Sequence, residues 1–305
     1  MSQTSRNNWL QWKYDNIEFG PKVTPRSKFS LDFKKIISRP VKSYYEELFE
    51  NAKITRDIFT GKFNLLLSGG VDSEIVLRVY HQLKIPVEVY IFKYEKNYNY
   101  RDVNQAIQIC NALGIDYNLI DFNLEKFFEN DAYDIFKKVY CHSSGRLPQM
   151  KMTEYLDGIP IYGSGEPYCK RASSNWSKKS DWVIDMGEGA RCWAVYHKSI
   201  NRTAICDWYE FSPELLVSYF NIDLIKELMS DSIQGKLSSN SSKIPIHQKL
   251  WQDITLRPKL VGFEGINEPG TKPPFMLEFE KEFITDKVDT ADIYMSKKFL
   301  FDLIC

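Results

Sequence analysis

The stretch Ser68-Gly69-Gly70-Val71-Asp72-Ser73 decides how the fold of this chain is interpreted. The apolar run Phe63–Leu67 precedes it, and apolar residues follow at helical spacing from Ile75 to Leu83. The order is therefore strand, glycine turn, helix. Because a helix N-terminus presents unpaired N–H groups and consecutive glycines let the backbone approach an anion, the stretch predicts a phosphate-binding turn.

The side chains of this turn suit the same ligand. The hydroxyls of Ser68 and Ser73 can donate hydrogen bonds to phosphate oxygens, and the carboxylate of Asp72 can hold Mg²⁺ against them. The chain contains no GxxxxGK[ST] stretch, so this is not the lysine-bearing phosphate loop. The competing interpretation is a glycine turn that only packs the helix on the sheet.

Strands and helices alternate on the C-terminal side of the turn. The sequence predicts a strand at Val87–Phe92, a helix over 102–113 with Gly114 as its C-cap, and a strand at Tyr117–Phe122. This alternation predicts an α/β fold, with a parallel doubly wound sheet and helices on both faces.

The rest of the chain is less regular. We expect an irregular arm or edge strand over 1–30 and two helices within 31–59, separated at Pro40. Further expected elements are helices over 124–139, 147–156 and 222–234, a strand at 159–162, a helix at 213–220 capped by Ser212, and loops at 235–242 and 264–274. Residues 180–205 give no clear pattern. We divide the chain into an arm with helices that pack on the core (1–60) and a main domain with a C-terminal helical and loop extension (61–305).

Composition limits the classes of function. The 305 residues include 40 basic and 40 acidic side chains, so a strongly basic nucleic-acid binder is not indicated, although a local basic patch is compatible with zero net charge. The six cysteines form no CxxC pair. No secretory segment and no apolar run of bilayer length is apparent, so we expect a cytoplasmic protein with reduced thiols.

The quoted turn resembles the PP-loop, whose pattern is SGGxDS. The resemblance implies the adenine nucleotide α-hydrolase-like fold and an enzyme that cleaves ATP between its α and β phosphates, with the loop holding the pyrophosphate that leaves. Within the PP-loop ATP pyrophosphatases, the chain is most similar to the synthetase domain of asparagine synthetase and β-lactam synthetase, over roughly residues 60–265.

Three further stretches carry this resemblance. Val89–Lys93 and Asn97–Asp102 are similar to the second strand and its loop, where the backbone near Phe92 would meet adenine. Ile161–Pro167 resembles the second glycine-rich loop, but Pro167 stands where that family has an aspartate, which leaves Glu166 as the nearest carboxylate. Arg257–Gly265 resembles the late lysine-bearing segment, in which Lys259 would stabilise charge on the α-phosphate.

The resemblance thus implies a site. Its ATP- and pyrophosphate-binding residues are Ser68, Gly69, Gly70, Val71, Asp72, Ser73, Phe92, Gly163, Ser164 and Gly165. Asp72 and Glu166 are the candidate Mg²⁺ ligands, and Lys259 and Glu166 the candidate catalytic residues. The implied cofactors are ATP and Mg²⁺.

The implied reaction joins a carboxylate to an amine. A carboxylate is adenylated, and ammonia or an amine then displaces AMP. Because Ser2 follows Met1 and only about 60 residues precede the loop, we expect no glutaminase domain, so nitrogen would come as ammonia, as an amine substrate or from a separate nitrogen-donor subunit. The expected partners are therefore small carboxylates and amines, and no membrane is expected.

Two other functions remain open. One is a PP-loop enzyme that adenylates a carbonyl oxygen of tRNA or a nucleobase, in which case nucleic acid becomes a partner; the scattered cysteines and zero net charge argue mildly against thiolation and against tRNA. The other is a nucleotide-binding protein without catalysis, favoured by Pro167 and disfavoured by the intact Ser68, Asp72 and Ser73.

Overall fold

The protein is described by a computed structural model. The described residues are 10–13, 28–31, 39–139, 141, 143–164, 168–171, 182–185, 189–206, 208–225, 239–255, 257, 263 and 272–284. A four-stranded sheet in the order β5-β4-β3-β6 forms the centre. Its strands are β3 (Phe63–Leu66), β4 (Glu88–Tyr94), β5 (Tyr117–Phe122) and β6 (Ile159–Tyr162). All three pairings are parallel, and Leu65 lies opposite both Val89 and Ile161.

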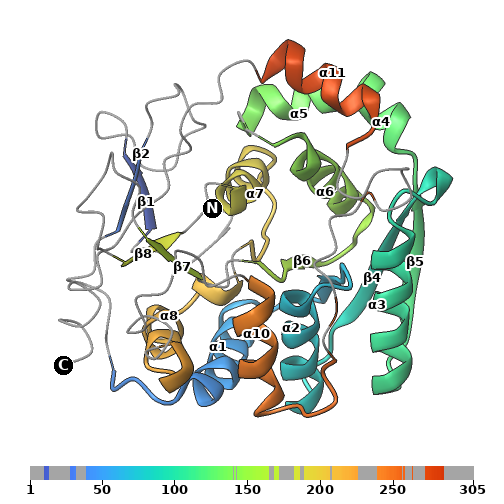
Figure 1. Cartoon of the computed structure of the whole chain (residues 1–305). Coiled ribbons are helices and arrows are strands. Elements are labelled where there is room, and N and C mark those ends of the chain that lie inside the picture. Colours follow the sequence, from blue (N-terminus) through green and yellow to red (C-terminus); the bar gives the residue numbers. More distant parts are fainter. Residues whose placement is uncertain are drawn as a thin grey trace.

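Helices cover this sheet (Figure 1). They are α1 (Tyr44–Ile58), α2 (Val71–Gln82), α3 (Tyr100–Leu113), α4 (Leu124–Asn130), α5 (Ala132–Val139), α6 (Leu147–Met152), α7 (Gly189–Ser199), α8 (Pro213–Phe220), α10 (Ser239–Gln248) and α11 (Pro274–Phe283). Short 3₁₀ turns are η2 (Glu95–Asn97), η3 (Ser144–Arg146), η4 (Thr153–Tyr155) and η5 (Trp208–Glu210). Two antiparallel pairs complete the description, β1 (Leu10–Lys13) with β2 (Lys28–Leu31) and β7 (Tyr168–Arg171) with β8 (Trp182–Asp185).

The two faces of the sheet bury two separate hydrophobic clusters. Side chains alternate along each strand, so Leu65 and Ile91 belong to one cluster while Phe92 and Tyr162 belong to the other. The first cluster also takes apolar residues from α1, α2, α3 and α8, and the second from α4, α5, α6, α7 and α11. Figure 1 shows these groups in the lower and upper parts of the molecule, respectively, with α3 lying along β4. The predicted parallel, doubly wound α/β sheet is confirmed.

The order of the strands creates a crevice at one edge of the sheet. The chain runs from β3 through α2 to β4 and through α3 to β5, and it then returns by α4, α5 and α6 to β6 on the other side of β3. The connections after β3 and β6 therefore lead to opposite faces. A ligand site is expected outside the carboxyl ends of these two strands, because this is the topological switch point.

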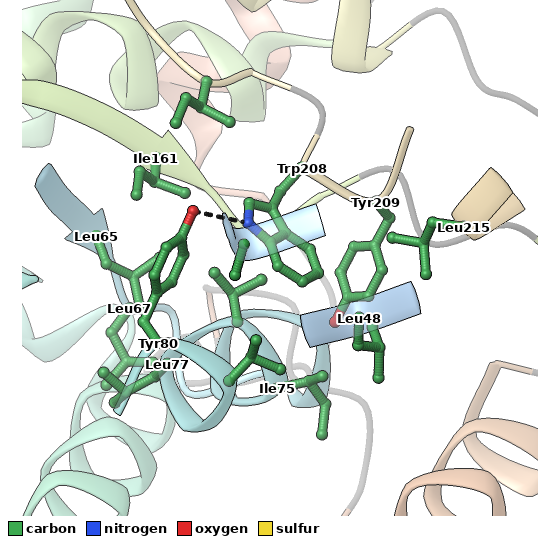
Figure 2. Packing of buried hydrophobic residues seen from close by; sticks show 14 of the residues in the cluster. Leu48, Leu65, Leu67, Ile75, Leu77, Tyr80, Ile161, Trp208, Tyr209 and Leu215 are labelled. Atoms are coloured by element: carbon green, nitrogen blue, oxygen red, sulfur yellow. Dashed lines mark hydrogen bonds between the residues drawn. The ribbon is translucent and has the colours of Figure 1, made fainter. Parts of the chain in front are cut away.

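Buried aromatic residues connect α1, α2 and η5 in the first cluster. Trp208 is fully buried, and its Nε1–H donates to the Tyr80 hydroxyl at 3.0 Å, which Figure 2 shows as a dashed line. The Tyr80 hydroxyl also lies 2.6 Å from Thr55 Oγ1, and Asn51 donates to the Trp208 carbonyl at 2.8 Å. Burial raises the pKa of Tyr80 to about 12, so the phenol stays protonated. These bonds satisfy polar groups that would otherwise be costly to bury.

A buried ion network fixes α2 to the late part of the chain. Glu74 accepts a hydrogen bond from Arg78 Nε at 2.8 Å and another from Arg257. Arg78 also forms a bidentate pair with Asp253, at 2.7 and 3.1 Å. Glu74, Arg78 and Arg257 are each less than a tenth exposed. The N-terminal half of α2 is therefore joined to residues 175 and 183 positions later in the sequence.

Some sequence predictions need correction. Leu31 ends strand β2 and does not start a helix, because the chain pairs there with β1. The expected loop over 235–242 is wrong from Ser239, where α10 begins despite its polar first turn. The single helix expected over 124–139 is broken at Asp131 into α4 and α5. The expected helix over 222–234 and the loop over 264–274 lie mostly outside the described residues.

Other boundaries are confirmed. Strand β5 and helix α8 have the predicted limits, and Ser212 caps α8. Gly114 takes a left-handed conformation with φ of 65° at the end of α3. None of the described helices is long and apolar enough to cross a membrane.

Candidate functional site

The turn between β3 and α2 places its backbone close to α3. Gly69 has a φ of +76°, and a Cβ at this position would lie 2.4 Å from the carbonyl oxygen of Asp102. Only glycine avoids both the left-handed strain and this contact. The next residue, Gly70, is the N-cap of α2 and supplies no side-chain cap. The first N–H groups of α2 therefore have no side-chain cap, which suits them to an anionic ligand.

Two serines shape the inside of this turn. The Ser68 N–H donates to Ser73 Oγ at 3.3 Å, and Ser73 Oγ donates to the Gly70 carbonyl at 3.1 Å. The Ser68 and Ser73 hydroxyl oxygens lie 3.1 Å apart. This arrangement places two hydroxyl groups side by side at the start of α2, and either could turn its proton toward a bound phosphate.

The loop after β6 packs directly on the start of α2. A Cβ at Gly163 would lie 2.5 Å from the Cα of Ser73, so the two backbones approach as closely as glycine allows. Ser164 Oγ donates to the Cys206 carbonyl at 2.7 Å. Tyr209 connects both loops, because its N–H donates to the Ser164 carbonyl at 3.3 Å and its hydroxyl donates to the Asp72 carbonyl at 2.8 Å.

A cavity of about 320 Å³ opens at this switch point. The β3–α2 turn, the end of β4, the start of α3, α6, the end of β6 and α7 all contribute to its lining. The lining residues are Leu66, Leu67, Ser68, Gly70, Ser73, Tyr90, Ile91, Phe92, Tyr94, Asn99, Asp102, Val103, Gln149, Met152, Tyr162, Gly163, Ser164 and Trp193. Polar loop groups thus meet a largely aromatic wall in one space.

Stacked aromatic rings form the wall that faces the second cluster. The rings of Tyr162 and Trp193 lie 4.7 Å apart at 15° to one another. The guanidinium of Arg146 lies over the Trp193 ring, 5.2 Å from its centroid, and forms no ion pair with any residue in the described part of the chain. Such cation–π contacts hold a cation in place without neutralising it.

His197 supports this wall from behind. Its Nε2 lies 3.0 Å from the Tyr162 hydroxyl. Burial, and secondarily the charge of Arg202, lowers the pKa of His197 to about 3. The imidazole is therefore neutral at physiological pH and serves as a hydrogen-bond partner of Tyr162 rather than as a charge.

Asn99 fixes the end of β4 next to the cavity. Its amide donates to the Phe92 carbonyl at 2.9 Å, and its Oδ1 accepts from the Tyr94 N–H at 2.8 Å. Burial raises the pKa of Tyr94, and the nearby charge of Asp102 adds to this effect. Asn99 and Asp102 lie within the stretch 97–102 that resembles the family loop, yet neither was expected to line the site.

The structure brings together six of the predicted nucleotide-binding residues as cavity lining: Ser68, Gly70, Ser73, Phe92, Gly163 and Ser164. Gly69, Val71 and Asp72 belong to the same turn but do not line the cavity. Gly165, Glu166 and Lys259 lie outside the described residues. Among the described residues, no group of three or more His, Cys, Asp or Glu side chains could hold a metal.

Besides Asn99 and Asp102, the lining residues that the sequence did not predict include Gln149, Met152 and Trp193. These three come from α6 and α7, and no motif marks them. The crossover from β5 to β6 brings α6 to the site, and the chain that follows β6 brings α7 there. The stretch around Trp193 also fell within the part of the sequence that gave no clear pattern.

Comparisons with known proteins agree with the geometry of the turn. Residues 62–145 match the family described as "Queuosine biosynthesis protein QueC". A 7-cyano-7-deazaguanine synthase from Methanocaldococcus jannaschii is 31% identical over 97 residues, which are 32% of this chain and 38% of that protein. The match therefore spans well under half of the length of this relative.

Solved structures give weaker likenesses. The NH3-dependent NAD synthetase of Campylobacter jejuni aligns with a TM-score of 0.31 and 13% identity, over 85% of this chain and 95% of that one. The NMN synthetase of Francisella tularensis aligns with a TM-score of 0.29 and 19% identity, over 39% of this chain and 52% of that one.

The SGGVDS turn between strand and helix lies inside the matched segment, so the sequence match supports the predicted PP-loop ATP pyrophosphatase superfamily for this part of the chain. The comparisons name queuosine-related proteins and NAD or NMN synthetases. A closer relation to asparagine synthetase stays a prediction from the sequence.

Proposed function

We propose that this protein is an ATP-dependent ligase that forms AMP and pyrophosphate, adenylating a carboxylate for attack by an amine or ammonia. The observation that carries the proposal is the cavity at the switch point. It joins the serines of the β3–α2 turn, the Gly163 and Ser164 backbone, and an aromatic wall in one space.

The β3–α2 turn would hold the leaving pyrophosphate. The uncapped N–H groups of α2 and the hydroxyls of Ser68 and Ser73 are donors suited to phosphate oxygens. The turn also offers a ligand for Mg²⁺. Asp72 is half-buried there, and Mg²⁺ takes one or two carboxylates beside substrate phosphates. When bound, Mg²⁺ would neutralise charge on the pyrophosphate. The backbone of Phe92 and the Gly163–Ser164 segment would border the rest of the nucleotide.

Arg146 favours a carboxylate as the acceptor. Its guanidinium is fixed over Trp193, a residue of the cavity wall, and has no acidic partner among the described residues. A carboxylate can accept two hydrogen bonds from such a group. The carboxylate oxygen would attack the α-phosphorus as the bond to the pyrophosphate oxygen breaks. The amine nitrogen would then attack the acyl carbon, lose a proton and release AMP. Lys259 and Glu166 remain proposed as catalytic residues, with Glu166 also a proposed metal ligand.

A planar heterocycle is the second candidate acceptor. The flat Tyr162–Trp193 stack suits a ring, and one partial relative is named for making a deazaguanine product. This corresponds to nucleobase modification, the alternative function expected from sequence. A substrate of this kind would use the same turn and the same cavity.

Pyrophosphate exchange tests the proposal. Purified protein would be incubated with Mg²⁺, ATP and labelled pyrophosphate, in separate reactions with amino acids, other small carboxylates, and deazapurines with or without a carboxylate. We expect label in ATP with a carboxylate pool, a loss of at least 100-fold in Asp72→Ala, and no change in Asp116→Ala, an exposed acid between α3 and β5. Exchange only with uncharged heterocycles would favour the second acceptor, and ATP binding without exchange in any pool would contradict the ligase.

A further inference from the structure

Two cysteines far apart in sequence lie in contact beside the cavity wall. Cys141 follows α5 and Cys192 lies in α7, 51 positions later, yet their sulfur atoms are 3.3 Å apart. Neither residue forms a disulfide in this structure, and both are buried, with 2% and 4% of their surfaces exposed. Cys141 also donates to the Ser143 carbonyl at 3.4 Å. The six scattered cysteines of the sequence therefore include a close pair that spacing alone did not indicate.

Cys110 and Cys206 provide an internal reference. Cys110 lies on α3 in the opposite hydrophobic cluster, where burial raises the pKa of its thiol to about 11. Cys206 lies in the same cluster as the pair. The 3.3 Å approach thus joins two cysteines of the second cluster, on the other side of the sheet from Cys110.

We propose that Cys141 and Cys192 form a reversible dithiol–disulfide modification site. A small peroxide is a suitable oxidant, because it can enter where a larger disulfide reagent cannot. One thiolate attacks a peroxide oxygen, forming a sulfenic acid as the O–O bond breaks and water leaves. The second sulfur then displaces a second water to form the S–S bond. Two thiols are oxidised by two electrons, one peroxide is reduced to two waters, and a small dithiol reverses the change.

The geometry requires only a short movement. The sulfurs must approach from 3.3 Å to about 2.05 Å, the length of a disulfide bond. Pairs whose backbones hold them far apart cannot do this. The bond would close a long loop that contains α6 and β6, and it would restrict the unfolded chain accordingly.

The site lies next to groups of the cavity. Trp193 follows Cys192 directly and stacks on Tyr162, and Arg146, which lies over Trp193, is in the short segment that follows Cys141. A disulfide would therefore tie together the two pieces of chain that supply this wall. This inference does not depend on the acceptor or on any ligase activity.

Peptide mapping tests the proposal directly. The full-length protein would be treated with hydrogen peroxide, its remaining thiols blocked with N-ethylmaleimide in denaturant, and the chain cut with trypsin. The sequence places Cys141 alone in the peptide 139–146 and Cys192 alone in the peptide 192–198. We expect these two peptides joined, with a loss of about 2 Da that dithiothreitol restores. Separate peptides carrying sulfinic acid, or a link through Cys110 or Cys206, would overturn the proposal.

Matched variants and a second reagent complete the test. Cys110→Ser should still form the link, whereas Cys141→Ala and Cys192→Ala should not. Should either alanine variant fail to fold, arsenite, a small reagent whose arsenic binds two neighbouring thiols, keeps the test decisive in the wild-type protein. One arsenical bound per molecule, with the 139–146 and 192–198 peptides protected from N-ethylmaleimide, supports the pair. Protection of any other cysteines would contradict it.

Discussion

Helices α1 and α2 pack in the same hydrophobic cluster but begin in opposite ways. At α1, Ser43 accepts from the Glu46 N–H at 3.4 Å and the Glu46 carboxylate accepts from the Ser43 N–H at 3.1 Å, which is a complete capping box. At α2, the N-cap is Gly70 and no side chain takes this place. The chain satisfies the first helix end with its own side chains, whereas the second has no side-chain cap. The second end therefore has the backbone N–H groups that the proposed phosphate site requires.

The largest expected effect comes from adding a side chain to the glycine turn that precedes α2. Gly69→Ala would put a Cβ 2.4 Å from the Asp102 carbonyl oxygen at a positive φ, so the loop must move away from its position beside the cavity. We expect ATP affinity to fall by roughly 100-fold, since a displacement of about 1 Å in a binding loop has effects of this size. Isothermal titration with ATP measures this.

Gly114→Ala is the matched control for that substitution. Gly114 also has a positive φ, of +65°, but a Cβ there meets nothing within 4 Å. The Gly114→Ala substitution should lower the free energy of unfolding by about 1 kcal/mol and leave ATP affinity unchanged. Equal losses of ATP affinity in both variants would show that the turn has no special role.

A smaller effect is expected from giving α2 the cap that it lacks. Gly70 has a φ of −72°, and a Cβ there would lie 3.4 Å from Ser68 Oγ, so a side chain fits. Gly70→Asp should stabilise the helix by a few tenths of a kcal/mol but lower ATP affinity roughly 10-fold, because its carboxylate occupies and repels the phosphate position. Thermal melting and ATP titration of the same sample give both values, and Gly70→Asn separates occupancy from charge. Unchanged affinity in both variants would exclude phosphate binding at this helix end.

Removing a serine hydroxyl should have different effects at the two helix ends. Ser43→Ala removes the cap of α1 and should lower the free energy of unfolding by about 1 kcal/mol without changing ATP affinity. Ser68→Ala removes a hydroxyl from the ligand turn and should weaken ATP binding roughly fivefold, as loss of about one hydrogen bond does. Urea denaturation and ATP titration of both variants test the contrast. A result in which Ser43→Ala impairs binding as much as Ser68→Ala would remove the distinction between the two termini.

The smallest effect is a pH dependence confined to α1. Hydrogen bonds from the Ser43 side chain and, secondarily, its backbone lower the pKa of Glu46. Since the folded pKa lies below the unfolded one, this stabilisation is present above the unfolded pKa and is lost as pH falls through the folded one. The melting temperature of Glu46→Gln relative to wild type, followed from pH 6 to pH 3, should therefore show a deficit that shrinks at acid pH. A constant deficit would mean that the charge of Glu46 does not contribute.

The sequence was most informative where local chemistry determines structure. The SGGVDS turn, the αL cap at Gly114 and the Ser212-Pro213 helix start are all local signals, and each predicted element was found. The alternation of strands and helices was enough to predict a parallel sheet. Ser239 shows the limit, because its polar surroundings suggest a loop while the apolar side chains of Ile244 and Ile246 are buried in the core and hold α10 in place.

The site was predictable mainly in its glycine-rich parts. Gly163 was predicted from the resemblance to a second glycine-rich loop, and the structure shows its close approach to Ser73. Trp193, Gln149 and Arg146 could not be, since they reach the site through the crossover from β5 to β6 and through α7. The contact between Cys141 and Cys192 likewise depends on how α5 and α7 pack, which no spacing in the sequence records.

The ion network at α2 also constrains how this chain can change over generations. Glu74 is the one carboxylate in contact with both Arg78 and Arg257 in the described chain, and all three are buried. Loss of the acid alone would leave two cations close together with less compensation, whereas joint replacement by apolar residues would remove the problem. Substitutions at these three positions should therefore be inherited together, and a library that varies them singly should recover far fewer folded proteins than one that varies them as a set.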